Sequence, residues 1–280
     1  MKKISRRSFL AAAAVSAAAL ALTACGGSAS TASSAAASSV AASSEAASTS
    51  AAAAELTTVE AGKLTMATNA TFPPYEMTTD AGEFEGIDVD TAKAIAEKLG
   101  LELQIDDMDF DAALLSVQQG KADIVMAGVT VTDERKAVMD FSDSYATGIQ
   151  SIIVPNDSDI ASPDDLAGKK IGTQRGTTGY IYCSDDFGDE NVVAYDDGLT
   201  AVQALNNGQV DAVVIDNAPA QEFVAANPGL KVLDTSYAEE DYAIGMAKGS
   251  ALEDAVNKAL EELKADGTLQ SIVDKYITAE

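Results

Sequence analysis

Short apolar segments alternate with amphipathic stretches along the chain from about residue 56 onward. Residues 63–68 have the length and apolar character of a strand. Residues 88–99 repeat apolar side chains at helical spacing and end at Gly100, a residue that commonly terminates a helix. The strand–helix–strand order continues through 101–105, 110–119 and 122–126. Such alternation predicts a parallel sheet with right-handed crossovers.

The alternation is repeated after residue 150, which predicts a second α/β unit. The strands expected there are 169–173, 191–195 and 210–215, with helices from 176, over 198–207 and over 218–226. Two extended segments, near 149–154 and 242–247, could each cross between the units. Helices over 252–265 and 269–276 would return to the first unit. The expected fold is α/β with two lobes joined by two hinge strands, lobe 1 comprising 59–150 and 244–280 and lobe 2 comprising 151–243.

The N-terminal 58 residues do not have the pattern of a folded domain. Residues 1–24 combine a basic start with an apolar run that is too short to span a membrane comfortably, which predicts a signal peptide. The run ends in Leu-Thr-Ala-Cys25-Gly, which resembles a bacterial lipobox, so we expect a lipid on Cys25. Ser5 to Leu10 also resembles a twin-arginine export signal, and twin-arginine and general export both stay open. Residues 25–58, nearly all Ala, Ser, Thr and Gly, are expected to be a disordered tether.

Composition excludes several classes of function. The 280 residues contain no histidine, which removes His-dependent catalysis and most zinc sites, and no metal or cofactor is expected. The formal net charge of −26 disfavours nucleic acid and anionic lipid surfaces, so the lipid anchor is the one membrane contact expected. Cys183, the second of two cysteines, is expected to be a small buried apolar residue.

Candidate binding chemistry gathers at residues 127–136, Ala-Gly-Val-Thr-Val-Thr-Asp-Glu-Arg-Lys. They follow an apolar strand and lead into a short helix for which Thr132 is the expected N-cap. Hydroxyls, free helix N–H groups and a guanidinium at such a junction suit a carboxylate.

Seven motifs, in order, give the chain a family resemblance over roughly residues 60–280. They are Phe72-Pro-Pro-Tyr75, Gly86-Ile-Asp-Val-Asp90, Met108-Asp-Phe-Asp111, Gly128-Val-Thr-Val-Thr-Asp-Glu-Arg135, Phe141-Ser-Asp143, Asp165-Leu-Ala-Gly-Lys-Lys170 and Gly176-Thr-Thr178. The chain resembles the extracytoplasmic amino-acid-binding proteins of ABC importers, solute-binding protein family 3, of the glutamine-binding and lysine/arginine/ornithine-binding type. The resemblance implies a type II periplasmic-binding-protein-like fold. It also implies a lipid-anchored monomer outside the cell membrane that closes on a free amino acid and delivers it to an ABC permease.

The resemblance also assigns charge partners for an amino acid. Arg135 would hold the ligand carboxylate, assisted by the Thr130 hydroxyl and the Gly128 amide. Asp216, which follows the apolar strand 211–215, would hold the ammonium; its alternative role is the N-cap of the next helix. Thr177 and Thr178 of lobe 2 would complete the carboxylate site through their amides or hydroxyls.

The remaining matched positions concern the ligand side chain. Phe72 and Phe110 would stack on it, and Asn69 would contact its far end. Asn69 is neutral where the family often carries an acid, which favours a polar uncharged ligand such as glutamine. Arg175 would permit an acidic ligand if it faced the cleft.

The alternative function is a cleft enzyme of the same fold, of the cyclohexadienyl or arogenate dehydratase type, although the sequence shows no nucleophile beside a base.

Overall fold

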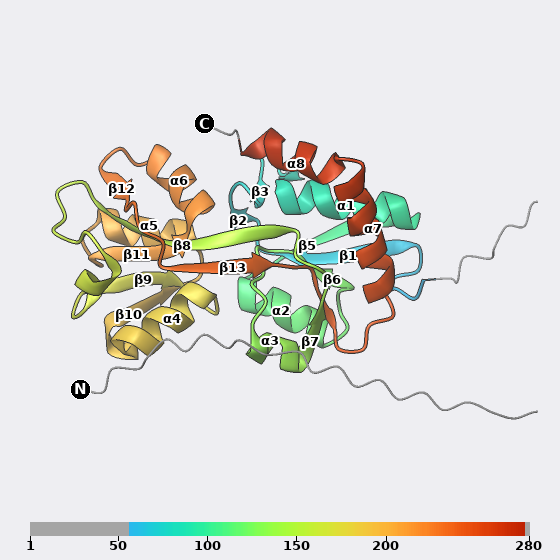
Figure 1. Ribbon diagram of the computed structural model, residues 1–280, viewed down its shortest axis with the longest axis horizontal. Coiled ribbons are helices and arrows are strands. Elements are labelled where there is room, and N and C mark those ends of the chain that lie inside the picture. Colours follow the sequence, from blue (N-terminus) through green and yellow to red (C-terminus); the bar gives the residue numbers. More distant parts are fainter. Residues whose placement is uncertain (1–55, 278–280) are drawn as a thin grey trace, which may run out of the picture. The chain divides into compact units, whose positions relative to one another are not determined.

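The computed structural model describes residues 56–277 of the chain, and the expected signal peptide, Cys25 and most of the expected tether lie outside that range. The two-lobe α/β fold expected from the sequence is confirmed (Figure 1). Each lobe is built on its own sheet. Two long strands, β8 (Ala146–Pro155) and β13 (Ala238–Tyr242), pair antiparallel and run between the lobes.

The first lobe is a five-stranded sheet, in the order β5-β1-β6-β14-β7, with helices on both faces. Leu64 and Met66 of β1 point into one core with α1, α7 and α8, and Ala67 points into the other core with α2, as the two-residue period of a strand requires. The elements are β1 (Lys63–Thr68), α1 (Ile87–Leu99), β5 (Glu102–Asp107), α2 (Phe110–Gln118), β6 (Ile124–Val125), α3 (Asp133–Val138), β7 (Met139–Phe141), β14 (Gly245–Ala247), α7 (Glu253–Ala265) and α8 (Thr268–Tyr276), with a small antiparallel sheet of β2 (Thr71–Phe72), β3 (Glu76–Thr78) and β4 (Phe84–Glu85).

Helix α1 shows how the local sequence sets an element. Asp88 and Asp90 lie in its first turn and Lys98 in its last, matching the helix dipole. Gly100 ends the helix in the left-handed conformation (φ 71°), and its N–H bonds the last carbonyls. The expected range and terminator are therefore confirmed.

The second lobe is a sheet in the order β10-β9-β11-β8-β12, packed between helices. Its strands β9, β10 and β11 are parallel, and Ile171 and Ile215 lie in separate cores on its two faces. The elements are β9 (Ile171–Gln174), α4 (Thr178–Phe187), β10 (Val192–Tyr195), α5 (Gly198–Asn206), β11 (Ala212–Asp216), α6 (Asn217–Ala225) and β12 (Leu230–Val232), with short 3-10 helices over Pro163–Leu166 and Asp189–Asn191.

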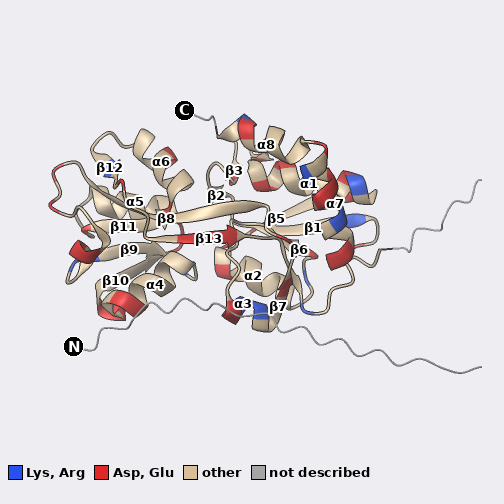
Figure 2. Cartoon of the chain, in the orientation of Figure 1, with Lys and Arg blue, Asp and Glu red and all other residues tan. Residues whose placement is uncertain are grey.

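Two expectations about the strands need correction. Both sheets are mixed, since β14 and β7 in lobe 1 and β8, β12 and β13 in lobe 2 pair antiparallel. The second crossing strand lies at 238–242 instead of 242–247, because Gly245–Ala247 already pairs within the lobe 1 sheet. The crossing strand is hard to recognise because it reads Ala-Glu-Glu-Asp-Tyr, and Figure 2 shows it as an acidic segment. The lobe limits at 150/151 and 243/244 stay a prediction.

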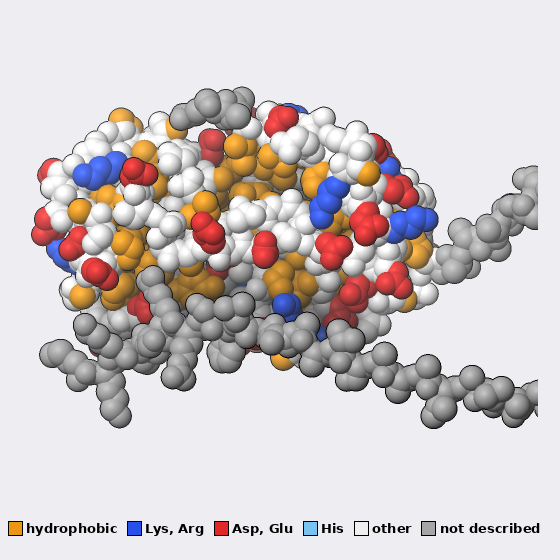
Figure 3. Space-filling view, in the orientation of Figure 1, with side chains coloured by type: hydrophobic (Ala, Val, Ile, Leu, Met, Phe, Trp, Pro, Cys, Tyr) orange, Lys and Arg blue, Asp and Glu red, His pale blue; other side chains and the backbone are white. Residues whose placement is uncertain are grey.

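Among residues 56–277, most acidic side chains are exposed or half-buried. On the face visible in Figure 3 they are scattered among polar and basic groups and do not gather in one patch. Among residues 56–277, no helix has both the length and the apolarity needed to cross a membrane.

Candidate ligand-binding site

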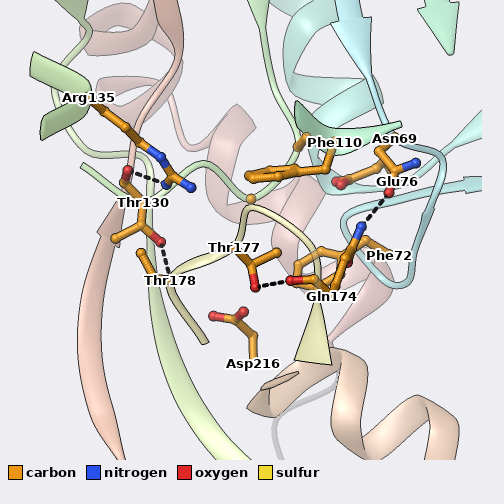
Figure 4. A pocket seen from close by; sticks show the side chains of 12 residues that line it. Asn69, Phe72, Glu76, Phe110, Thr130, Arg135, Gln174, Thr177, Thr178 and Asp216 are labelled. Atoms are coloured by element: carbon orange, nitrogen blue, oxygen red, sulfur yellow. Dashed lines mark hydrogen bonds between the residues drawn. The ribbon is translucent and has the colours of Figure 1, made fainter. Parts of the chain in front are cut away.

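A buried pocket lies between the two lobes, and all nine residues predicted to bind a ligand line it (Figure 4). Lobe 1 contributes residues from the end of β1 to β3, from the start of α2, and from the stretch between β6 and α3. Lobe 2 contributes the ends of β9 and β11 and the start of α4. The lining residues are Asn69, Phe72, Glu76, Phe110, Ala127, Gly128, Thr130, Arg135, Gln174, Thr177, Thr178 and Asp216.

Arg135 is the buried cation of this pocket. The Thr132 hydroxyl caps α3 by accepting from the Arg135 amide, as expected. This bond holds the first turn of the helix that carries Arg135. The guanidinium donates to the Thr130 carbonyl at 2.7 Å and, across the cleft, to the Gly176 carbonyl at 3.1 Å. It also lies over the Phe110 ring, 5.4 Å from the centroid. Burial lowers the pKa of Arg135, so an anion in the pocket would offset the desolvation of its charge.

Asp216 is the acid at the carboxyl end of β11. It occupies the N-cap position of α6, but its side chain makes no capping hydrogen bond. The carboxylate instead accepts from Gln150 Nε2 at 2.9 Å and from the Tyr242 hydroxyl, so both strands between the lobes hold it. Burial raises the pKa of Asp216 to about 7, and the nearby charge of Glu240 adds to this effect. The simple alternative, a helix cap, therefore does not explain this side chain.

The hydroxyls of the pocket all have partners within the protein. Thr177 caps α4, because its oxygen accepts from the Tyr180 amide while its proton goes to the Gln174 carbonyl at 2.8 Å. The Thr130 and Thr178 hydroxyls both contact Glu240, at 3.2 and 2.9 Å. None of these three hydroxyls keeps its proton for a ligand carboxylate.

The Gly128 amide also has another partner. Expected to donate to a ligand, it donates instead to the carboxylate of Asp88 at 3.0 Å, and Asp88 is fully buried. Gly128 still lines the pocket. Its φ of 54° and the Phe72 ring, 2.8 Å from where a Cβ would lie, explain why only glycine fits there.

Glu76 is a pocket-lining acid that the sequence analysis missed. It is fully buried, and among residues 56–277 neither of its carboxyl oxygens has a hydrogen-bond partner. Burial, followed by the charge of Asp88, raises the pKa of Glu76 well above its ordinary value. Burial also raises the pKa of Asp88, to about 6. Burial therefore favours the protonated form of the Glu76 carboxyl over its charged form.

The far end of the pocket is a pair of side-chain amides. Gln174 of lobe 2 donates to the Asn69 oxygen at 2.8 Å, and Asn69 donates to the Met108 carbonyl at 2.9 Å. Phe72 stacks on Tyr75 with ring centroids 5.9 Å apart, and with Phe110 it provides apolar walls.

Some of the residues that were not predicted have a recognisable position in the sequence, and others do not. Glu76 directly follows the Phe72–Tyr75 motif, and Gln174 ends an apolar strand just as Asp216 does, so position could have flagged both. Glu240 lies in an unpatterned acidic run, and Gln150 lies inside a long strand.

Two further residues considered in the sequence, Arg175 and Cys183, lie away from the pocket. Arg175 is exposed and pairs with Asp196 at 3.4 Å in a separate surface hollow. Cys183 is fully buried, as expected, and burial raises the pKa of its thiol to about 12.

The pocket can therefore neutralise a ligand that carries both charges. A buried guanidinium faces the same cavity as a buried carboxylate, and a small zwitterion could leave water there with a partner for each charge.

Known proteins with similar sequences and folds agree with this architecture. The L-cystine-binding protein TcyJ of Escherichia coli (strain K12) is 33% identical over 225 residues, which cover 79% of this chain and 85% of that protein. Two solved structures of ancestral arginine-binding proteins, one bound to glutamine and one to arginine, are 42% and 43% identical and both have a TM-score of 0.74. They cover 78% and 77% of this chain and 99% and 98% of their own chains. Residues 64–279 match the bacterial extracellular solute-binding proteins, family 3, and the chain belongs to this family.

Proposed function

We propose that the protein binds one free L-amino acid between its lobes, outside the cell membrane, and delivers it to the permease of an ABC transporter. The observation that carries this proposal is the placement of Arg135 and Asp216, two buried opposite charges, in one cleft between two hinged lobes. In the proposed complex, the α-carboxylate lies at Arg135 and at the backbone amides that begin α4, and the α-ammonium lies at Asp216. The similarity of the chain to proteins that are named as amino-acid-binding proteins supports the proposal.

A thermal-shift screen of the purified chain against the twenty amino acids tests the proposal. A ligand at 100 times its Kd stabilises the native state by about 2.7 kcal/mol, which raises the unfolding midpoint by a few degrees. At least one amino acid should give this shift. No shift with any of them at millimolar concentration would overturn the proposal.

For the ligand side chain, we propose a polar uncharged group, with glutamine as the first candidate. The Asn69–Gln174 pair supplies donors and acceptors of the kind that an amide needs. Both residues are neutral and buried, so they would not balance a charged side chain.

A basic amino acid is the second candidate, favoured by Glu76. A guanidinium beside Glu76 would find a carboxyl group with two unpartnered oxygens. Because burial raises the pKa of that carboxyl, a cation beside it would favour the loss of its proton. Calorimetry in two buffers of different ionisation enthalpy separates the candidates, since binding of arginine should release more protons than binding of glutamine.

We propose that the protein is a lipid-anchored monomer, tethered through Cys25. The sequence of residues 1–58 supports this. A Cys25→Ala variant should leave the membrane fraction of cells that export it, whereas continued retention in that fraction would contradict the anchor.

We propose binding without catalysis. The relatives that share the fold are binding proteins by name, which supports the proposal. Turnover of prephenate or arogenate by the purified chain would instead favour the dehydratase alternative.

A further inference from the structure

Glu240 lies at the centre of the hydrogen bonds that join the two lobes. The alternation of β13 turns Glu239 and Asp241 outward to solvent and Glu240 inward, where it is 7% exposed. One oxygen of Glu240, Oε2, lies 3.2 Å from the Thr130 hydroxyl of lobe 1 and 2.9 Å from the Thr178 hydroxyl of lobe 2. The same oxygen lies 3.0 Å from Gln150 Nε2 on β8.

These contacts fix the direction of the hydroxyl protons. An amide nitrogen can only donate, so Glu240 Oε2 is an acceptor toward Gln150. An oxygen acting as an acceptor for three donors is typical of a carboxylate, and each threonine has a single proton to give it. The oxygens of Thr130 and Thr178 therefore have only lone pairs left for other partners. The Thr178 oxygen also lies 3.4 Å from Gln150 Nε2 and 3.4 Å from the Thr130 oxygen, and both contacts are longer than the bonds to Glu240.

The acceptors lie on the same side of the pocket as Asp216. Gln150 Nε2 donates both to Glu240 Oε2 and to Asp216 Oδ2, at 3.0 and 2.9 Å, and so links the two acids. We call the Asp216 carboxylate and the hydroxyl oxygens of Thr130 and Thr178 the acceptor cluster. An ammonium has three protons to donate and no lone pair, so it matches such a cluster, whereas a ligand carboxylate would be repelled by it.

We infer that Glu240 is a positioning residue that turns the Thr130 and Thr178 hydroxyls into acceptors for the α-ammonium of the ligand. The inference rests on the proposed function and adds to it a side chain of the strand between the lobes, which sets the direction of the hydroxyl protons. Glu240 does not touch the ligand. It acts through the two hydroxyls, and the α-carboxylate is left to Arg135 and the backbone amides.

The test compares ligands with and without the ammonium in the Glu240→Leu variant, which removes the acceptor with little change in side-chain size. The probes are L-glutamine and 4-carbamoylbutanoate, its counterpart without the α-amino group, with L-arginine and 5-guanidinopentanoate as a second pair. Dissociation constants come from calorimetry, by displacement for the weaker probes. Glu239→Gln is the matched control, since it removes one charge from the same strand on its exposed face.

Glu240→Leu should weaken binding of the amino acid at least tenfold and change binding of its counterpart less than twofold, while Glu239→Gln changes neither. An unchanged affinity for the amino acid would overturn the inference, and so would an equal loss for both members of a pair, because Glu240 would then only shape the cavity. If Glu240→Leu does not fold, Thr178→Val should show the same selective loss, and an equal loss there overturns the inference. A wild-type chain that binds no amino acid overturns the proposed function and the inference with it.

Discussion

At the scale of single residues, the account depends on a buried pair of opposite charges in a cleft. Truncating Arg135 to alanine leaves a ligand carboxylate without its charged partner, at a cost of roughly 2–5 kcal/mol. Binding of the amino acid found by the screen should therefore weaken at least tenfold in calorimetry. Arg175→Ala is the matched control, because Arg175 is exposed and pairs with Asp196 outside the pocket, and it should bind like the wild type. Equal affinities for the wild type and Arg135→Ala would remove Arg135 from the site.

The affinity for the amino acid should also depend on pH, through the carboxyl group of Asp216. The pKa of Asp216 is raised to about 7 by burial, and an ammonium beside it would lower that pKa. Only the ionised form attracts the ligand, so affinity should be highest above pH 7 and fall up to about tenfold per unit below it. Calorimetry from pH 8.5 to 5.5 measures the slope. Asp216→Asn should bind weakly and lose this slope, whereas a flat profile in the wild type contradicts the assignment.

Some of the site could be predicted at this scale and some could not. The positions of Arg135 and Asp216 followed from strand ends and motifs, and both line the pocket. The hydrogen-bond partners could not be predicted, because Thr130 and Gly128 meet Glu240 and Asp88, residues 110 and 40 positions away in sequence. Which proton each group donates depends on contacts that only the folded chain brings together.

At the scale of elements, the two strands between the lobes hold the site as well as joining the lobes. Gly148 of β8 packs against the Tyr242 ring of β13, and a Cβ at Gly148 would lie 2.5 Å from that ring. Tyr242 in turn donates to Asp216. The strands are therefore close enough that a single methyl group should disturb the acid of the site.

Gly148→Ala should destabilise the protein by about 1–3 kcal/mol through overpacking and also weaken amino-acid binding. Urea unfolding and calorimetry measure the two effects. Gly229→Ala is the control, since a Cβ there meets nothing within 4 Å, and it should change neither. If Gly148→Ala matches this control in both measurements, the strands do not position Asp216 in this way.

Elements were predictable where the local pattern was strong. Helix α1, its terminator Gly100 and the Thr132 cap of α3 follow from side chains within one or two turns. Strand β13 was missed because its pattern is acidic: only Glu240 and Tyr242 are buried. Glu240 meets the polar groups of Thr130, Thr178 and Gln150, and Tyr242 alone joins the apolar core. The antiparallel strands were missed because alternation along the chain does not give the direction of pairing in space.

At the scale of the whole molecule, the buried acids predict how stability depends on pH. The pKa values of Glu76, Asp88 and Asp216 are all raised by burial, those of Asp88 and Asp216 to about 6 and 7. The folded state therefore binds protons more tightly than the unfolded state, and stability falls as pH rises from about 4 to 7. The repulsion expected from a net charge of −26 acts in the same direction.

Without added ligand, the unfolding midpoint should be several degrees higher at pH 5 than at pH 8, as measured by calorimetry. Surface acids with lowered pKa values, such as Asp266 at about 2, affect stability only below this window. Asp88→Asn and Asp216→Asn should each flatten the profile, which separates the buried acids from general repulsion. A midpoint that rises with pH between 5 and 8 would contradict the buried charges described here.

The central claim is that one amino acid lies between the lobes with its two charges on Arg135 and Asp216. A crystal structure of the chain grown with the amino acid selected by the screen measures this directly. We expect the α-carboxylate within hydrogen-bond distance of the Arg135 guanidinium and the α-ammonium within hydrogen-bond distance of the Asp216 carboxylate. An amino acid bound elsewhere, or held in the cleft without contact to either side chain, would contradict it.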